Sequence, residues 1–274
     1  MIRLLKYTGA KIKFIDQINI EINKTNCSAY IEPFCGSAAI FLNLEKQFRH
    51  YIISDIDKYV IKIFETFRNI TFDQLNRFYN KNIQTFGNWG ENKDSFYAFR
   101  QYCNKKYFNS NSEEEGMFLY FMNKSCLNSI FRVGKNGCTC TFGNRGRSLI
   151  LNEDQFLQIQ HKLKNTTIQQ CDFFEFHNQT YISLDNERTL LFLDPPYSKT
   201  NHAYQGKATA EFNCDRFLNL IRYYKSKIIY TDLYDKKIDK LLNWRVVKLG
   251  NLVSIRPHKS SGTYRGEQVM YINF

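Results

Sequence analysis

The sequence predicts a doubly wound α/β fold that is interrupted by a mostly helical insertion. Apolar runs typical of buried strands recur along the chain, and helix-like patterns lie between several of them. The runs cover 29–33, 51–54, 166–169, 189–193, 227–230 and 268–273. Over residues 59–120 the apolar side chains instead recur at helical spacing. We therefore expect a Rossmann-like sheet formed by residues 1–58 and 149–274, and an inserted domain formed by residues 59–148.

Composition and charge indicate a globular protein with a polyanionic partner. The chain has 274 residues, of which 43% are hydrophobic, enough for a sizeable core, and a formal net charge of +12. Such a charge predicts a nucleic acid or an anionic membrane as partner. No apolar run approaches the length of about 20 residues that a spanning helix needs, and charges interrupt the first nine residues. We expect an intracellular protein that binds nucleic acid, does not associate with membranes and needs no obligatory protein partner.

The cysteines and histidines do not form the pattern of a metal site. Cys138 and Cys140 are one residue apart, and no second close pair of cysteines follows or precedes them. The five histidines stand alone in the sequence. We expect reduced thiols, as is usual in the cytosol, and no metal.

One apolar run ends abruptly in Asp194-Pro195-Pro196-Tyr197. Two prolines cannot continue a strand, so the chain must turn there. Ligands of open α/β sheets bind just outside the carboxyl ends of strands. The Asp offers carboxylate acceptors, the prolines offer a stiff backbone with free carbonyls, and the Tyr offers a flat ring. This combination suits a planar ring that carries an amino group. The alternative is a strand-ending turn with a solvated Asp.

A strand, a turn of small residues and a helix start follow one another over residues 30–42. Small residues such as Gly36 let a backbone approach a ligand, and the amides of a helix N-terminus point at it. The next strand ends in Asp55, whose carboxylate can accept both hydroxyls of a ribose. This order of elements predicts a nucleoside-containing cofactor at the turn.

The insertion is expected to hold four helices and a basic loop. The helices cover 60–68, 72–80, 93–104 and 113–122, with starts at Asp94-Ser95 and Ser112-Glu113. Residues 123–147 have the composition of a loop, with four glycines and no acidic residue. The basic residues of this loop are Lys124, Arg132, Lys135, Arg145 and Arg147. Such side chains bind phosphates, and arginine can also recognise guanine in the major groove.

Together these motifs resemble the amino-group DNA methyltransferases. Residues 194–197 match their Asp/Asn/Ser-Pro-Pro-Tyr/Phe motif, whose Asp form is typical of adenine N6 enzymes. Residues 34–38 look like the FxGxG of S-adenosylmethionine methyltransferases. Ala38 replaces the second glycine, and alanine resists positive φ, which bears on the turn geometry more than on binding. The order of cofactor turn, insertion and Asp-Pro-Pro-Tyr is similar to that of the α group, the Dam-type or D12 class.

The resemblance implies a set of residues that bind S-adenosylmethionine. Residues 6–11 match the family's K-[WY]-x-G-x-K, which implies Tyr7 and Lys11 near the methionine end. Asp55 matches the acid that binds the ribose, and Asp172 the Asp-Phe that contacts the cofactor's adenine. The implied cofactor-binding residues are Tyr7, Lys11, Phe34, Gly36, Asp55, Asp172 and Asp194. Taken alone, Lys6 and Lys11 would be interpreted as solvated surface lysines.

The resemblance also implies residues that contact DNA. Asn128 and Arg132 match the NGLxR of the family, in which Asn lies by the unpaired partner base and Arg holds the DNA. Residues 141–145 look like the loop end VPFGRY but lack its proline, so recognition of GATC is a hypothesis only. The implied DNA-contacting residues are Lys6, Lys124, Asn128, Arg132, Lys135, Arg145 and Arg147. The alternative for Asn128 and Arg132 is that they only cap and decorate a helix end.

Further aromatic and strand-end residues have other expected roles. Tyr204 is expected to line the base pocket, to clasp DNA or to lie in a plain surface loop. Phe192 and Phe212 are expected in the core, and residues 230–232, at the end of another strand, are given a structural role.

The function that follows is transfer of a methyl group from S-adenosylmethionine to N6 of an adenine flipped out of double-stranded DNA. The catalytic residues are expected to be Asp194, Pro195, Pro196 and Tyr197, with neither a metal nor a covalent intermediate. The alternatives are methylation of cytosine N4, of RNA adenine or of protein glutamine, and a DNA-binding protein that has lost catalysis.

Overall fold

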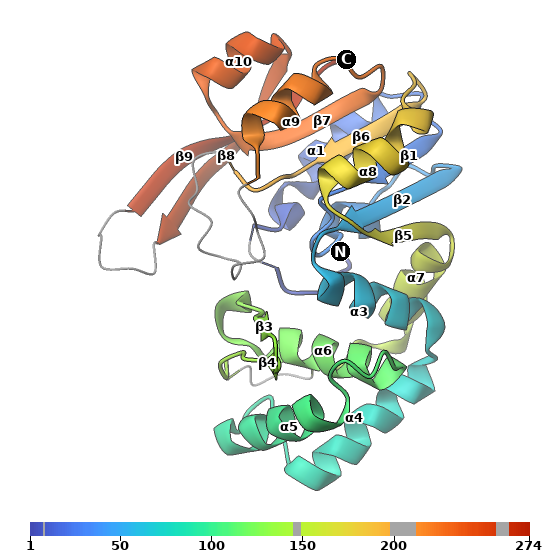
Figure 1. Cartoon of the computed structure of the whole chain (residues 1–274), viewed down its shortest axis with the longest axis vertical. Helices are drawn as coiled ribbons and strands as arrows, with labels where there is room; N and C mark the ends of the chain where they lie inside the picture. The colour runs from blue at the N-terminus through green and yellow to red at the C-terminus, as the bar shows by residue number, and fades with distance from the viewer. Residues whose placement is uncertain (8, 145–148, 198–211, 256–262) are drawn as a thin grey trace. The chain divides into compact units, whose positions relative to one another are not determined.

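The central element of the fold is a seven-stranded, mostly parallel sheet (Figure 1). The computed structural model describes residues 1–7, 9–144, 149–197, 212–255 and 263–274. The strands are β1 (Ala29–Glu32), β2 (His50–Asp55), β5 (Thr166–Gln170), β6 (Thr189–Leu193), β7 (Lys227–Leu233), β8 (Arg245–Ile255) and β9 (Thr263–Ile272). Their order is β5-β2-β1-β6-β7-β9-β8. The strands β2, β1, β6 and β7 are parallel, and β9 runs antiparallel to both β7 and β8. The predicted α/β class is confirmed.

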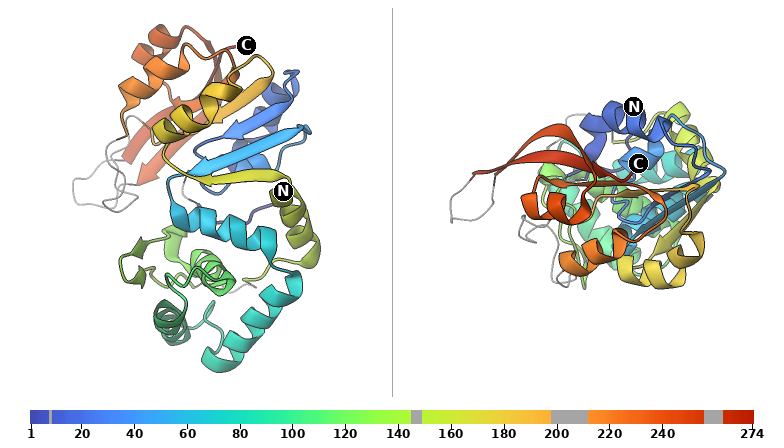
Figure 2. Two further views of the ribbon diagram at one scale, coloured as in Figure 1. Left: turned by 45° about the vertical axis from the view of Figure 1, so that its right-hand side comes forward. Right: turned by 90° about the horizontal axis from the view of Figure 1, so that it is seen from above.

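The pattern of burial explains why the predicted strands could be found in the sequence. Every residue of β6 is buried, because this strand lies between β1 and β7. A central parallel strand that is covered on both faces has a continuous apolar sequence. The helix α1 (Ile15–Asn23) covers one face of the sheet, and α8 (Phe173–Gln179) and α9 (Cys214–Ile221) cover the other (Figure 2).

The edge strand β8 was not predicted. Its sequence contains Arg245, Lys248, Gly250 and Asn251, which interrupt the apolar alternation. An edge strand has only one partner and tolerates such residues. The pairing of β8 with β9 also has a register shift between Lys248 and Gly250. Strand β9 begins at Thr263 rather than at the predicted residue 268.

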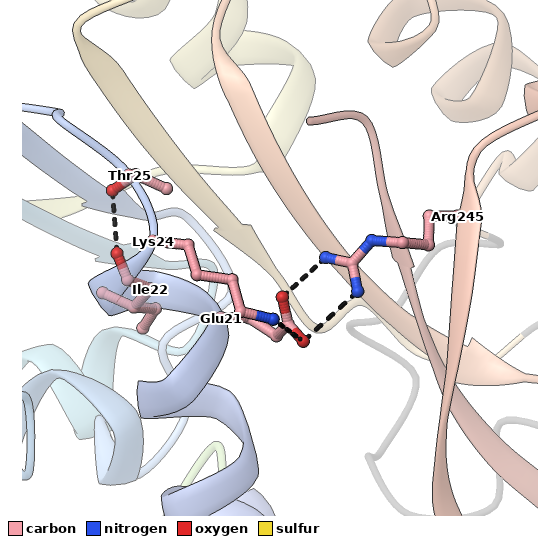
Figure 3. A network of polar contacts seen from close by, with 5 residues as sticks. All are labelled: Glu21, Ile22, Lys24, Thr25 and Arg245. Atoms are coloured by element: carbon pink, nitrogen blue, oxygen red, sulfur yellow. Dashed lines mark hydrogen bonds and ion pairs between the residues drawn. The ribbon is translucent and has the colours of Figure 1, made fainter.

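An ion pair joins α1 to β8 (Figure 3). The guanidinium of Arg245 donates to both carboxylate oxygens of Glu21, at 3.3 and 2.6 Å, and the ammonium of Lys24 lies 2.9 Å from one of them. Glu21 is only 5% exposed. The hydrogen bonds from Arg245 hold the pKa of Glu21 below its usual value. Paired in this way, the buried carboxylate connects the helix to the edge of the sheet.

By its internal contacts the chain divides into two compact units. The first unit comprises Met1–Ile12, Gly36–Asn43 and Ser54–Cys171, and the second comprises Lys13–Cys35, Leu44–Ile53 and Asp172–Phe274. The predicted insertion, residues 59–148, lies entirely within the first unit. Its boundaries as a separate domain stay a prediction.

The four predicted helices of the insertion are confirmed. They are α3 (Lys58–Asn69), α4 (Phe72–Phe86), α5 (Lys93–Lys106) and α6 (Glu113–Ser125). Each begins after a side chain that caps its first amides, namely Asp57, Thr71, Asn92 and Ser112. The predicted start at Asp94-Ser95 is wrong by two residues, because Asn92 accepts a hydrogen bond from the amide of Ser95 at 2.9 Å. The short α2 (Ala39–Leu42), α7 (Glu153–Lys164) and α10 (Lys236–Leu242) complete the α-helices of the described residues.

The predicted basic loop contains regular structure within its described residues, 123–144. Its first residues, 123–125, belong to α6, and a hairpin of β3 (Val133–Gly134) and β4 (Gly137–Cys138) occupies its middle. Residues 125–127 and 141–143 lie side by side, since the amide of Leu127 donates to the carbonyl of Thr141 at 2.9 Å and that of Gly143 to the carbonyl of Ser125 at 3.0 Å. Strands of two residues are too short to leave a periodic pattern in the sequence.

No helix in the described part of the chain is long and apolar enough to cross a membrane. All eight cysteines lie within the described residues, and none of them forms a disulfide.

Candidate active site

The Asp-Pro-Pro-Tyr segment follows the carboxyl end of β6, at the centre of the sheet. Along the chain, strand order runs outward from β1 to β2 on one side and from β6 to β7 on the other. The pair β1 and β6 is therefore the switch point at which open α/β sheets bind ligands. Asp194 is half-buried, Pro195 is buried and Pro196 is exposed. This placement of the motif agrees with the prediction from sequence.

Two buried side chains of neighbouring strands hold this segment. The hydroxyl of Thr231, on β7, donates to the Asp194 carboxylate at 2.6 Å. The amide nitrogen of Gln268, on β9, donates to the Tyr197 hydroxyl at 2.8 Å. The sequence predicts a structural role for residues 230–232 and gives no functional indication for Gln268. The indication in the sequence was the position of Thr231 near the end of a predicted strand beside the motif.

Phe34, a predicted cofactor residue, lies in a cluster of aromatic rings. Its ring stacks on Phe173 at a centroid distance of 5.2 Å and meets the edges of Phe212 and Phe217 at 5.5 and 5.9 Å. Phe34 and Phe212 are half-buried. Phe212 is therefore less buried than a core residue, which the sequence predicts it to be. Phe192 is 1% exposed, and its predicted place in the core is confirmed.

The small-residue turn after β1 has a left-handed backbone at two positions. Gly36 has φ 46°, and Ala38 has φ 50° and ψ 35°. Alanine thus takes the conformation that glycine would adopt at less cost. A Cβ atom at position 36 would lie 2.9 Å from Cε1 of Tyr7, so the Tyr7 ring rests on this glycine. The structure brings together Tyr7 and Gly36, both predicted to bind the cofactor.

Asp55, at the end of β2, is tied to this turn. Its carboxylate accepts the amide of Gly36 at 2.8 Å and that of Asp57 at 2.9 Å. Burial raises the pKa of Asp55 to about 6, and the two amide hydrogen bonds oppose the rise. Each carboxylate oxygen has a second lone pair. Asp55 can therefore accept further hydrogen bonds from a diol while it holds the turn.

Two other predicted cofactor residues make local contacts. Lys11 is 4% exposed, and its ammonium donates to the carbonyl of Gly9 at 2.9 Å. Asp172 caps α8 by accepting the amides of Phe174 and Glu175 at 2.7 and 3.0 Å. Lys11 is thus not the solvated surface lysine that the sequence alone would suggest, and Asp172 has a structural role whether or not it meets a ligand.

Lys6 and Lys124, both predicted to contact DNA, lie together at the end of α6. The ammonium of Lys6 donates to the carbonyl of Lys124, and that of Lys124 to the carbonyl of Arg3 at 3.2 Å. The buried amide of Asn123 exchanges two hydrogen bonds with the backbone of Lys6, at 2.8 and 2.9 Å. Burial, followed by the charges of Lys6 and Arg3, lowers the pKa of Lys124 to about 7. We call Arg3, Lys6 and Lys124 the basic cluster.

Three further residues predicted to contact DNA lie around the hairpin. Asn128 is exposed in a short 3-10 turn with φ 50°, and Arg132 and Lys135 are exposed before and within the hairpin. Asn104 of α5 anchors the hairpin through two hydrogen bonds to the backbone of Cys138, at 3.0 and 2.8 Å. Arg145, Arg147 and Tyr204 lie outside the described residues.

Comparisons with known proteins agree with this arrangement. Residues 7–250 match the family described as D12 class N6 adenine-specific DNA methyltransferase. The chain is 28% identical over 232 residues to the type II methyltransferase M.MjaIII of Methanocaldococcus jannaschii, covering 81% of this chain and 78% of that protein. It is 29% identical over 216 residues to the DNA adenine methylase of Haemophilus influenzae, covering 76% of this chain and 68% of that protein. A third relative is the type II methyltransferase M.CviBI of Paramecium bursaria Chlorella virus NC1A, 24% identical over 81% of this chain and 78% of that protein. Because the family match spans the cofactor turn, the insertion and the Asp-Pro-Pro-Tyr segment, the chain belongs to the D12 class of N6 adenine-specific DNA methyltransferases.

Proposed function

We propose that this adenine-specific DNA methyltransferase uses S-adenosylmethionine as its methyl donor and acts on an adenine flipped out of double-stranded DNA. The observation that carries the proposal is the Asp194 carboxylate at the carboxyl end of β6, held by Thr231 and followed by the ring of Tyr197. Flipping is required because the N6 atom cannot be reached inside a duplex. Flipping the base costs a few kcal/mol of free energy through lost pairing and stacking. Contacts with the protein must offset this cost.

In the proposed reaction, the residues of the Asp-Pro-Pro-Tyr segment orient and polarise the base. The Asp194 carboxylate and the Pro195 carbonyl accept hydrogen bonds from the two N–H groups of the amino group, and the Tyr197 ring stacks on the base. These acceptors draw the nitrogen lone pair out of conjugation with the ring. As the new N–C bond forms, the bond between the methyl carbon and the sulfonium sulfur breaks and its electron pair stays on the sulfur. The amino nitrogen loses one proton along its hydrogen bond to Asp194. The rate enhancement comes from in-line positioning and from the placed negative charge.

The residues that we propose for donor binding fit S-adenosylmethionine by their chemistry. Asp55 retains acceptor capacity for the two ribose hydroxyls, and the Tyr7 ring lies against Gly36 where a Cβ atom would otherwise stand. We propose Tyr7 and Lys11 for the methionine end, Phe34 and Asp172 for the adenine end, and Asp194 near the reacting methyl group. When bound, the donor supplies an activated methyl group on a sulfonium, so no metal is needed to activate it.

Donor binding is expected to weaken below about pH 6, because protonation of Asp55 removes a hydrogen-bond acceptor. The dissociation constant should rise by about tenfold for each pH unit below this pKa and stay level above it. Calorimetric titrations of S-adenosylmethionine across this range measure the profile. In Asp55→Asn, binding should be weak and independent of pH.

Weaker donor binding below about pH 6 would not result from unfolding caused by protonation of Asp55. The folded-state pKa lies above the ordinary value of 3.8, so protonation of this group stabilises the fold as the pH falls from about 6 towards 4. A wild-type protein whose affinity for the donor is constant from about pH 5 to 7 would contradict the assigned role of Asp55.

The basic cluster and the hairpin are proposed to bind the DNA backbone and the flanking bases. The charge for phosphates is proposed to come from Lys6, Lys124, Lys135, Arg145 and Arg147. We assign Asn128 and Arg132 to the site of the flipped base. Neutralisation of phosphates makes binding dependent on salt. We propose residues 59–148 as the target-recognition domain.

The lowered pKa of Lys124 predicts a pH-dependent affinity for DNA. Since this pKa is about 7 without DNA, Lys124 is mostly neutral at higher pH. It must then take up a proton before it can pair with a phosphate. The affinity should therefore fall as the pH rises from about 6 to 9, while Lys124→Arg, which stays charged, should bind with a flatter profile. Fluorescence anisotropy with a labelled duplex at constant salt measures both. If the affinity for DNA depends on pH equally in the two proteins, Lys124 does not contact a phosphate.

One experiment tests the proposed function as a whole. Purified protein is incubated with labelled S-adenosylmethionine and duplex DNA, and the modified bases are located by nucleotide-resolved sequencing. We expect label at adenine N6 in a fixed sequence context. Label at cytosine N4, or in RNA but not in DNA, would refute the proposed acceptor. Digestion of the product with nucleases sensitive to methylated GATC tests that sequence directly, since unprotected GATC sites in fully modified DNA would exclude it.

A further inference from the structure

The strands β7 and β9 present two side chains to the Asp-Pro-Pro-Tyr segment from the same side of the sheet. In the parallel register Leu193 pairs with Tyr230, so Asp194 lies beside Thr231. In the antiparallel register Thr231 pairs with Met270, two residues from Gln268. Side chains alternate between the faces of a strand, so Thr231 and Gln268 project from one face. The side chains that hold Asp194 and Tyr197 therefore project from the same face of the sheet.

We infer that Thr231 and Gln268 are positioning residues for methyl transfer, a role that rests on the proposed function of the Asp-Pro-Pro-Tyr segment. Thr231 orients the Asp194 carboxylate, and Gln268 fixes the plane of the Tyr197 ring. Neither needs to touch the base. Each acts through a residue that does.

Thr231 is well suited to fix a carboxylate. It is completely buried, and it donates to one Asp194 oxygen at 2.6 Å, a distance typical of a hydrogen bond to a charged acceptor. A β-branched side chain has few rotamers, so the hydroxyl is a rigid donor. The engaged oxygen keeps a second lone pair, and the carboxylate retains acceptor capacity for the base. A misplacement of about 1 Å in such a group can cost roughly 100-fold in rate.

Gln268 is kept in the core at an energetic cost. It is 3% exposed, and within the described ranges its carbonyl oxygen has no hydrogen-bond partner. Buried amides are normally satisfied at both ends, and exceptions call for a reason. Its hydrogen bond to the Tyr197 hydroxyl, at 2.8 Å, is such a reason. A tyrosine held at its hydroxyl cannot rotate away from a stacking base.

The test of Thr231 compares a variant without the hydroxyl with one that keeps it. Thr231→Val should lower kcat by roughly 10- to 100-fold, with KM unchanged for DNA and donor, and Thr231→Ser should restore most of the rate. The matched control is Thr189→Val, at the other end of β6. Thr189 is also buried and donates to the carbonyl of Leu184 at 2.8 Å. Its loss should reduce thermal stability without changing kcat.

The test of Gln268 is a double-mutant cycle with Tyr197. Gln268→Leu should lower the single-turnover rate by about 3- to 10-fold, the equivalent of one neutral hydrogen bond. Tyr197→Phe keeps the ring and removes the acceptor. In the Tyr197→Phe background the additional effect of Gln268→Leu should vanish, because the contact is already lost.

The possible outcomes separate the positioning role from the proposed function. If the wild type methylates adenine and Thr231→Val does so at the same rate, or if Thr231→Ser is as slow as Thr231→Val, the role of Thr231 is overturned. If the effects of Gln268→Leu and Tyr197→Phe are additive, that of Gln268 is overturned. A wild type that transfers no methyl group to adenine refutes the proposed function, and both roles with it. Should Thr231→Val fail to fold, Thr231→Ala tests the same hydroxyl.

Discussion

Asp194→Ala is expected to lower the rate of methyl transfer by roughly 10³-fold or more while leaving the fold intact. The variant removes both the acceptor for the amino hydrogen and the negative charge beside the reacting nitrogen, and one placed polar group at a reaction centre alone contributes roughly 10²- to 10³-fold. Folding should survive because the Thr231 hydroxyl keeps an alternative acceptor, the carbonyl of Leu193 at 3.3 Å. Single-turnover transfer to duplex DNA and thermal unfolding measure the two effects.

The control for this variant is Asp215→Ala. Asp215 is an exposed acid in the first turn of α9, so its removal deletes the same side chain without touching the Asp-Pro-Pro-Tyr segment. It should transfer methyl groups at the wild-type rate. An Asp194→Ala protein that labels DNA as fast as the wild type would remove Asp194 from the mechanism.

Gly143→Ala is expected to destabilise the protein by about 1–3 kcal/mol and to weaken DNA methylation. A Cβ atom at position 143 would lie 2.6 Å from the backbone nitrogen and Cα of Leu127. The backbone cannot rotate out of such a contact as a side-chain tip could. The paired segments 125–127 and 141–143 would have to separate, which would displace the turn that carries Asn128. Thermal unfolding and the KM for DNA measure the result.

Gly134→Ala is the matched control, because it adds the same methyl group to the same basic segment. There the nearest atom to the new Cβ is Cγ2 of Thr139, at 3.8 Å, an ordinary contact distance. We expect little change in stability or in KM. If the two glycine variants are equally stable, close backbone packing at Gly143 does not order this segment.

The sequence was sufficient for the fold class and for most of the elements. The central strands are buried on both faces, so their apolar runs are continuous and easy to find, as in β6. The four helices of the insertion also follow from local rules, since Ser112 and the other caps mark their starts. The edge strand β8 could not be predicted from the sequence, because a strand with a single partner tolerates polar residues.

The candidate site divides in the same way. The residues that carry the chemistry, Asp194, Tyr197 and Asp55, stand at strand ends and could be assigned by motif and by family resemblance. Tertiary structure alone pairs Thr231 with Asp194 and Gln268 with Tyr197, since the partners of each pair are 37 and 71 residues apart. It also decides that Ala38 adopts a left-handed backbone and that burial raises the pKa of Asp55. Local composition determines which groups are present, whereas their orientation and ionisation depend on neighbours that only the folded sheet brings into contact.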